Sequence, residues 1–237
     1  MIVLDNLSKT HALRGHRQIV ADGISATFPA RTSVALLGRN GAGKSSLLRM
    51  IAGTMDPDSG RVHRHGSVSW PVGFAGSFHG DLTGRQNARF IGRVYGVDTD
   101  ELARFATDFA ELGQHFDLPV KTYSAGMRAR LAFGISMGIG FDTYLVDEVT
   151  AVGDAAFRRR SERLFETRLA AAGAIVVSHS MPTVRRLCRA GAVLEAGRLT
   201  WHDDVGEAIR HHEEIIAGSV SGTDSPAAVG TALTFGR

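Results

Sequence analysis

The sequence predicts an α/β fold with a functional site at the carboxyl ends of its strands, and three observations support this. Strand and helix patterns alternate through most of the 237 residues, as in proteins built on an α/β sheet. Residues 38–45 read Gly-x-x-x-x-Gly-Lys-Ser directly after the apolar run 33–37 and before the helical pattern 46–52, in the order strand, phosphate loop, helix. The apolar runs 144–146 and 174–177 end in Asp-Glu and Ser-His, so polar side chains follow two buried strands at the edge where such sheets bind ligands.

The N-terminal part is expected to form an antiparallel β region. Residues 2–4 and 24–28 have strand composition and are separated by a polar stretch. Residues 62–70 alternate loosely between apolar and polar side chains and are expected to form one further strand, with His63 and His65 on the same face. These histidines are interpreted as part of a solvated face rather than a metal site, because two histidines alone rarely bind a metal.

A helical subdomain is expected over about residues 85–137. Helical spacing of apolar side chains predicts two helices over 85–95 and 100–112, and Asp98 stands where it can cap the second. A third helix is predicted over 128–137. The subdomain therefore lies in the sequence between the phosphate loop and the next buried strand.

The rest of the chain continues the α/β alternation. A helix is predicted over 155–172, two edge-like strands within 192–201 and an amphipathic helix over 204–217. Small and polar residues dominate afterwards, so residues 218–237 are predicted to be a disordered tail. One domain over residues 1–217 is therefore expected.

Composition indicates a packed soluble protein, with 43% hydrophobic and 22% charged residues. The single cysteine, Cys188, cannot form an internal disulfide and is expected to be a small buried residue in a reducing compartment. The longest weakly polar run, 131–141, is too short to cross a bilayer. No secretory signal is visible at the N-terminus.

Charge gives little sign of a nucleic-acid partner. The formal net charge is +3, and the basic residues are scattered, which suits a protein that handles an anionic ligand or lies near anionic lipid. The arginine clusters at 158–160 and 185–186 could touch anionic lipid or nucleic acid, and are interpreted as solvated helix faces. No nucleic-acid partner is therefore expected.

The phosphate loop predicts binding of ATP. Its glycines leave backbone N–H groups free to point at phosphate oxygens, and the helix that follows offers its positive end. Lys44 is expected to reach the β and γ phosphates, and the Ser45 hydroxyl to bind Mg²⁺. The predicted nucleotide-binding residues here are Gly38, Arg39, Asn40, Gly41, Ala42, Gly43, Lys44, Ser45 and Ser46.

The strand-end residues predict hydrolysis as well as binding. Asp147 closes an apolar strand and can hold Mg²⁺ opposite Ser45. Glu148 points elsewhere and can orient or deprotonate an attacking water. His179 closes the next apolar strand, where it can hydrogen-bond the γ-phosphate. Glu148 and His179 are the predicted catalytic residues.

The order of phosphate loop, Ser-x-Gly-Met at a helix start, Asp-Glu and strand-end His resembles that of the ATP-binding-cassette (ABC) ATPases over about residues 1–217. The resemblance implies a P-loop NTPase ATP-binding-cassette fold with an antiparallel β subdomain and a helical signature subdomain. It also implies a homodimer in which the signature of one chain faces the γ-phosphate bound by the other. The residues that match the signature are Ser124, Ala125, Gly126 and Met127.

Longer stretches are similar to the ATPase subunits of capsular-polysaccharide exporters. They are Ser-Trp-Pro-Val-Gly at 69–73, Leu-Thr-Gly-Arg-Gln-Asn at 82–87, Tyr-Ser-Ala-Gly-Met at 123–127 and the run 144–154. The resemblance implies two ATPase chains and two integral-membrane permease chains that move a lipid-linked acidic polysaccharide outward. The ATPase is then expected to be a peripheral protein on the cytoplasmic face of the inner membrane.

Some positions depart from the family pattern. His11 stands where many members stack a tyrosine on adenine, and a histidine offers less stacking area. His79 stands where many members carry a glutamine, and it is expected either to contact Mg²⁺ or water or to face the permease. Asp154 lies in the stretch Val-Gly-Asp, which resembles the short loop through which the two ATP sites of the family communicate.

Other ABC functions remain as alternatives. Exporters of O-antigen or teichoic acid are closely related, although some carry an added carbohydrate-binding domain after the cassette. A non-transport ABC ATPase acting on ribosomes or DNA is less favoured. Such proteins usually carry two cassettes or a long coiled coil, and the interval 85–112 contains only moderate-length helices.

Overall fold

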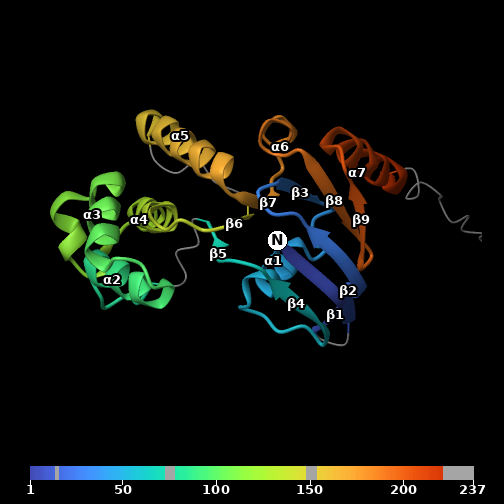
Figure 1. Cartoon of the computed structure of the whole chain (residues 1–237), viewed down its shortest axis with the longest axis horizontal. Helices are drawn as coiled ribbons and strands as arrows, with labels where there is room; N and C mark the ends of the chain where they lie inside the picture. Colours follow the sequence, from blue (N-terminus) through green and yellow to red (C-terminus); the bar gives the residue numbers. More distant parts are fainter. Residues whose placement is uncertain (14–15, 73–77, 148–153, 221–237) are drawn as a thin grey trace, which may run out of the picture.

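Two β-sheets and a separate group of helices make up the computed structural model, which describes residues 1–13, 16–72, 78–147 and 154–220 (Figure 1). The sheets with α1 (Lys44–Ala52), α6 (Met181–Leu187) and α7 (Val205–Val220) form the core lobe, and α2 to α4 form the helical lobe. Helix α5 (Ala155–Ala171) contacts both α4 and β7, so it connects the two lobes. The predicted α/β fold is confirmed.

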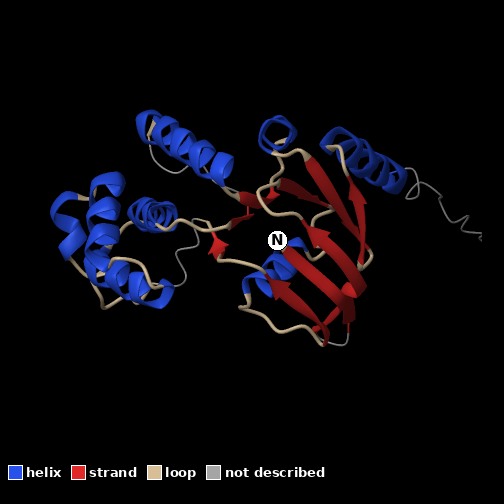
Figure 2. Ribbon diagram, viewed as in Figure 1, coloured by secondary structure: helices blue, strands red, loops and turns tan. Residues whose placement is uncertain are grey.

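A six-stranded sheet forms the centre of the core lobe (Figure 2). Neighbouring strands are parallel except for the last pair, which is antiparallel. The strands in spatial order are β5 (Val68–Pro71), β6 (Thr143–Asp147), β7 (Gly173–Val177), β3 (Ser33–Leu37), β8 (Ala190–Glu195) and β9 (Arg198–His202).

Alternation along β3 divides the core between the two faces of this sheet. Val34 and Leu36 pack with α1 and the antiparallel sheet, whereas Ala35 and Leu37 belong to the cluster that includes α5, α6 and α7. Both faces are covered, which explains why β3 and β7 are continuous apolar runs buried along their whole length. Cys188 lies in the second cluster, and burial raises the pKa of its thiol to about 12.

The antiparallel sheet corrects the prediction of two short strands in the N-terminal part. Its strand order is β2 (His16–Phe28), β1 (Ile2–Leu13), β4 (Ser59–Arg64). The stretch expected to separate two short strands is itself part of β1 and β2, because one face of this sheet is open to water and tolerates polar side chains. The irregular register between Leu4 and Thr10 also conceals the alternation.

The single strand predicted over 62–70 is wrong, because β4 and β5 belong to different sheets. Gly66 separates them with φ +99°, a conformation that glycine adopts at little cost. Ser67 then donates backbone and hydroxyl hydrogen bonds of 2.8 Å to Asp142 Oδ2, which brings β5 beside β6. His65 follows β4, and His63 is exposed with Nε2 4.0 Å from Asp5 Oδ2.

Helix caps define the helical lobe. Thr83 and Gln86 form a capping box at α2 (Gly84–Tyr95), and Asp98 accepts from two backbone N–H groups at α3 (Thr99–Ala110). Two 3₁₀ turns, η2 (Gly113–Asp117) and η3 (Val120–Thr122), lead to α4 (Ala125–Gly138). The helix predicted over 128–137 thus begins three residues earlier.

The C-terminal elements correct two further expectations. β8 is an interior strand between β3 and β9, not an edge, which agrees with its burial from Ala190 to Leu194. α7 continues to Val220, so the tail boundary predicted after residue 217 falls inside this helix. Residues 221–237 lie outside the described part of the chain.

Candidate functional site

The carboxyl ends of three parallel strands meet at one edge of the central sheet. Asp147 ends β6 and is paired with Val177 at the end of β7, and β3 runs alongside β7 into the phosphate loop. A pocket of about 400 Å³ opens there, within the size range of small-molecule sites. Its lining residues are His11, Gln18, Val20, Asn40, Gly41, Gly43, Lys44, Ser45, Ser46, Asp147, Val177 and His179.

Glycine is required at both ends of the phosphate loop. Gly38 has φ +149°, and a Cβ there would lie 2.3 Å from the Leu194 carbonyl oxygen. Gly43 has φ +102°, and its Cβ would lie 2.6 Å from Val20 Cγ1. Contacts below 3 Å are not tolerated without movement, so the loop can pass between β8 and β2 only without these side chains.

Lys44 lies at the start of α1 and bends back over the loop. Its Nζ donates to the Gly38 carbonyl at 2.6 Å and the Arg39 carbonyl at 2.9 Å. The residue before it, Gly43, makes no side-chain cap at this helix start, and the positive end of a helix suits an anion. The arrangement concentrates positive charge at the mouth of the pocket.

The β1–β2 hairpin contributes one wall of the pocket. His11 and Gln18 are cross-strand partners. His11 Nε2 lies 3.0 Å from Ser46 Oγ, and Gln18 Nε2 donates to the Gly41 carbonyl. Sequence reasoning found His11 but missed Gln18 and Val20. The polar stretch in the sequence was not recognised as two paired strands. In the structure, the pairing of β1 with β2 places Gln18 opposite His11.

Asp147 and His179 also line the pocket. Asp147 is half-buried at the end of β6, and His179 lies two residues beyond the end of β7. The structure therefore brings together the phosphate loop, His11, Asp147 and His179, which were predicted separately from the sequence. Glu148, the predicted base, lies outside the described residues.

Comparison with known proteins gives the family. A family model described as ABC transporter matches residues 21–151, more than half of the chain. The chain belongs to the ABC transporter family.

Relatives of this ABC protein are named as ATP-binding proteins of polysialic acid transport and capsule polysaccharide export. The polysialic acid transport ATP-binding protein KpsT of Escherichia coli is 47% identical over 197 residues, covering 82% of this chain and 88% of KpsT. The capsule polysaccharide export ATP-binding protein CtrD of Neisseria meningitidis serogroup B is 42% identical over 216 residues, covering 91% of this chain and 100% of CtrD. Relatives named as O-antigen and teichoic acid export proteins are less similar, at 33–35% identity.

Solved structures support the ABC fold independently. A dimeric ATP-binding cassette in a post-hydrolysis state, bound to ADP and Pi, superposes with a TM-score of 0.71 at 19% identity, covering 86% of this chain and 99% of that one. At such low identity the similarity establishes the fold alone.

His79 lies outside the pocket of this ABC subunit. Its backbone N–H donates to Asn87 Oδ1 at 2.9 Å, and Asn87 Nδ2 donates to its carbonyl at 3.2 Å. Asn87 is buried in α2 and was missed from the sequence. It anchors His79 to the helical lobe, so the structure does not bring His79 to Ser45 and Asp147. A role for His79 at Mg²⁺ remains a prediction.

The residues that match the ABC signature also lie apart from the pocket. Ser124 caps α4 by accepting from the Met127 N–H at 3.2 Å, and Ala125 and Gly126 form the first turn. This helix start belongs to the helical lobe and is not among the residues lining the pocket of its own chain.

The pocket has the oxygen donors that Mg²⁺ prefers. Ser45 supplies a hydroxyl and Asp147 a carboxylate, and Mg²⁺ commonly takes few protein ligands and completes its shell with phosphate and water oxygens. Within the described ranges, no group of three or more His, Cys, Asp or Glu side chains could hold a metal ion. A helix long and apolar enough to span a membrane is likewise absent from the part of the chain that the structure describes.

Proposed function

We propose that this chain is the ATP-hydrolysing subunit of an inner-membrane ABC exporter that moves lipid-linked capsular polysaccharide out of the cytoplasm. The ATPase part of this proposal rests on the pocket that the phosphate loop, Asp147 and His179 line together. The cargo is proposed from the similarity to KpsT and CtrD over most of both chains.

The geometry supports phosphoryl transfer to water. The loop N–H groups and Lys44 hold the phosphates, and Ser45 and Asp147 would hold Mg²⁺, which neutralises charge on the transferred group. Glu148 accepts a proton from the attacking water or orients it. His179, which lines the same pocket as Ser45, would hydrogen-bond the γ-phosphate. His11, which is hydrogen-bonded to Ser46, borders the nucleotide.

A second copy of the chain completes the site. The N-terminus of α4, at Ser124 to Met127, suits an anion because its first N–H groups carry the positive end of the helix dipole. Since these residues do not line the pocket of their own chain, we propose that they bind the γ-phosphate held by a partner copy. Two nucleotides would then lie between two chains.

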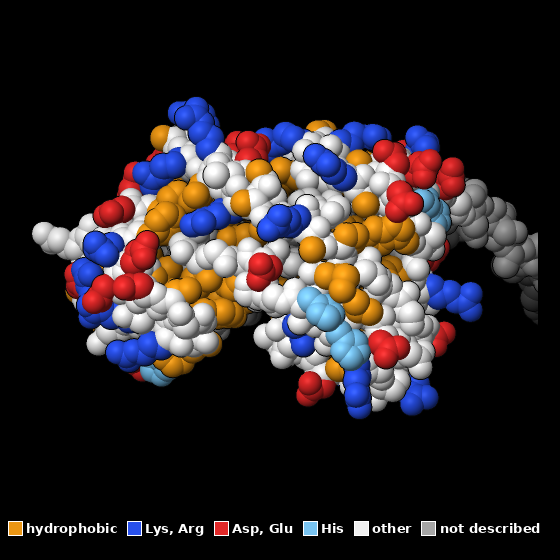
Figure 3. Space-filling model, viewed as in Figure 1, with side chains coloured by type: hydrophobic (Ala, Val, Ile, Leu, Met, Phe, Trp, Pro, Cys, Tyr) orange, Lys and Arg blue, Asp and Glu red, His pale blue; other side chains and the backbone are white. Residues whose placement is uncertain are grey.

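The permease subunits are proposed to dock on α2. Phe90 and Val94 are 55% and 62% exposed although both are large and apolar, and Tyr95 is 38% exposed. The three lie within residues 90–95 of one helix. Figure 3 shows hydrophobic surface on the side of the helical lobe that turns toward the core lobe. Such a patch on a peripheral subunit suits a membrane partner.

The decisive test is genetic. Deletion of the gene is expected to leave acidic polysaccharide inside the cell and none on its surface. A Glu148→Gln copy should behave like the deletion, and the unsubstituted copy should restore export. Unchanged surface polysaccharide would contradict the proposed cargo and leave an ABC ATPase with another load, such as O-antigen or teichoic acid.

A further inference from the structure

The residues that line the pocket fall into two groups of different chemistry. The phosphate loop, with Asp147 and His179, supplies the N–H groups, the ammonium group and the oxygen atoms that phosphates and Mg²⁺ need. The other wall consists of His11, Gln18 and Val20 from β1 and β2. An aromatic ring, an amide and an aliphatic side chain are groups with which proteins bind a flat heterocyclic base. This wall therefore suits the base of a nucleotide.

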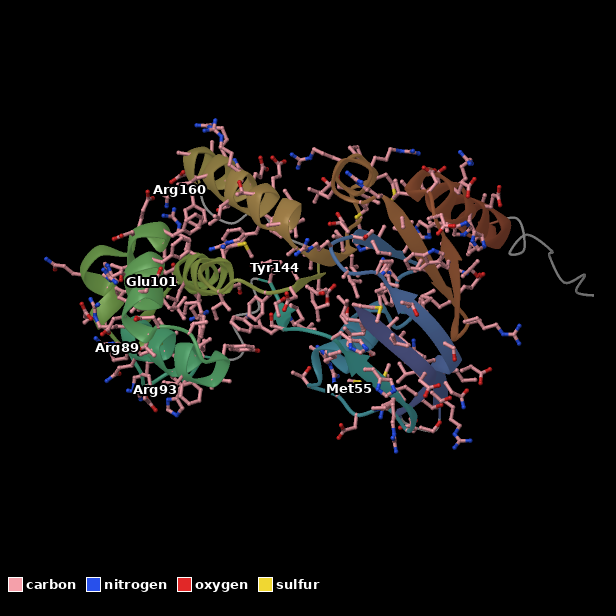
Figure 4. The ribbon with its side chains drawn as sticks, viewed as in Figure 1. Met55, Arg89, Arg93, Glu101, Tyr144 and Arg160 are labelled. Carbon is pink, nitrogen blue, oxygen red and sulfur yellow. The ribbon has the colours of Figure 1, made fainter. Side chains whose placement is uncertain are left out.

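Two side-chain hydrogen bonds join this wall to the phosphate loop. His11 Nε2 lies 3.0 Å from Ser46 Oγ, and Gln18 Nε2 donates to the carbonyl oxygen of Gly41. A Cβ on Gly41 would lie 4.0 Å from Gln18 Nε2, so the amide also packs against this glycine. In Figure 4, β1 and β2 lie on the side of the labelled Tyr144 that is away from the helical lobe. The wall therefore belongs to the core lobe.

The hydrogen bond to Gly41 fixes which way round the Gln18 amide lies. A carbonyl oxygen only accepts, so the end of the amide that meets it is the NH₂ group. The opposite end, Oε1, is an acceptor, and Gln18 is exposed where it lines the pocket. Phosphate oxygens are acceptors too. The Oε1 end therefore suits a ligand group that donates.

Purine bases differ at the position that such an acceptor reads. Adenine carries an exocyclic NH₂ group at position 6, which donates, whereas guanine carries O6, which accepts. Oε1 of Gln18 can accept from the adenine amine, but against O6 it would leave two acceptors facing each other unpaired. A fixed acceptor in this wall therefore favours ATP over purine nucleotides with oxygen at position 6.

We propose that Gln18 selects the base of the nucleotide. Its Oε1 accepts a hydrogen bond from the 6-amino group of adenine, and its Nε2, bound to the Gly41 carbonyl, keeps that orientation of the amide. This rests on the proposed ATPase site and concerns the choice of nucleotide rather than the hydrolytic step. His11 adds no such choice, because every base has a face on which a ring can stack.

The test compares ATP with inosine triphosphate (ITP) and 2′-deoxy-ATP. ITP carries oxygen at position 6 and keeps the ribose and the phosphates, whereas 2′-deoxy-ATP keeps the base and lacks a ribose hydroxyl, the other donor that Oε1 could meet. The full chain should bind ATP about tenfold more tightly than ITP, the scale of one hydrogen bond, and 2′-deoxy-ATP within about twofold of ATP. In the complete exporter complex, the ratio of kcat/KM for ATP and ITP should show the same preference.

Substitutions of Gln18 separate hydrogen bonding from packing. Gln18→Met keeps the length of the side chain and removes the amide, so ATP and ITP should bind within about twofold of each other. Gln114→Met, at an exposed glutamine of η2 in the helical lobe, is the matched control and should keep the preference of about tenfold. Gln18→Glu keeps an acceptor and adds a charge that repels phosphates. It should weaken binding of both nucleotides and still prefer ATP.

The outcomes distinguish this proposal from the proposed function. Absence of ATP binding and hydrolysis in the unsubstituted complex would overturn the proposed function, and the role of Gln18 with it. Equal binding of ATP and ITP by a chain that does bind ATP, or a preference that survives Gln18→Met, would overturn the role of Gln18 alone. Weaker binding of 2′-deoxy-ATP that Gln18→Met abolishes would show that the amide faces the ribose, and would equally overturn it.

Discussion

The core lobe and the helical lobe carry their functional residues in different ways. In the core lobe, strands buried on both faces bring the phosphate loop, Asp147 and His179 to one pocket. In the helical lobe, the signature at Ser124 and the apolar face of α2 lie at the surface, away from that pocket. The comparison teaches that one lobe gathers its candidate phosphate site within a single chain, while the residues of the other lobe that we propose to act on partner molecules lie outside that site.

The largest expected effects are in the core lobe. Glu148→Gln should lower the rate of ATP hydrolysis by at least about 100-fold, the contribution of a general base, and leave ATP bound in a closed dimer. Lys44→Ala should instead weaken ATP binding itself. Nucleotide affinity, dimer formation by light scattering and kcat separate the two. Normal hydrolysis by Glu148→Gln would show that another group activates the water.

Loss of the signature cap tests whether the helical lobe acts on a partner's nucleotide. Ser124→Ala should cost about 1 kcal/mol of stability and reduce hydrolysis, while ATP still binds the phosphate loop. Thr83→Ala removes the cap of α2 in the same lobe and serves as the control. It should cost similar stability without the loss of rate. Equal effects of both variants on kcat would indicate a purely structural role for Ser124.

The exposed face of α2 should matter for assembly more than for folding. Phe90→Ser and Val94→Ser should change the free energy of unfolding by no more than about 0.5 kcal/mol, as for other exposed positions. Co-purification of the chain with the permease should nevertheless fall. Leu118→Ser, at a separate exposed apolar position of the helical lobe, should leave co-purification unchanged. If all three variants assembled normally, the permease would dock elsewhere.

The smallest expected effect is a pH dependence of stability that arises from α7 in the core lobe. His212 on α7 is buried, and its Nδ1 has no hydrogen-bond partner among the described residues. Burial lowers its pKa, helped by the charges of Lys44 and His179, while Glu213 opposes the shift. The unfolded chain therefore takes up a proton near pH 6.5 that the folded chain resists. Stability is lost as the pH falls from this value toward the lowered pKa.

Thermal melts measure that loss. Between pH 7.5 and 5.5, His212→Gln should lose less Tm than the unsubstituted chain, by about 1–3 °C. His63→Gln, at an exposed position of the antiparallel sheet, should keep the full pH dependence. Identical slopes for all three proteins would show that His212 does not set it.

Most of the candidate site could be predicted from the sequence because it is encoded locally. The phosphate loop is recognised from eight consecutive residues, and helix caps such as Asp98 and Ser124 act within three residues of their partners. Asp147 and His179 were found because buried parallel strands are short apolar runs whose carboxyl ends share one edge.

Only the tertiary structure decided the relations that depend on which segments pair. The division of residues 62–70 between two sheets and the interior place of β8 rest on hydrogen bonds to distant strands, and Gln18 reaches the phosphate loop through its hydrogen bond to Gly41. The periodicity of one segment does not indicate which strand it will pair with. A contact between Arg130 on α4 and Asp154 likewise exists because α5 packs across both lobes. Local periodicity and loop chemistry thus predict the elements of the candidate site, whereas long-range packing decides which other segments line the pocket.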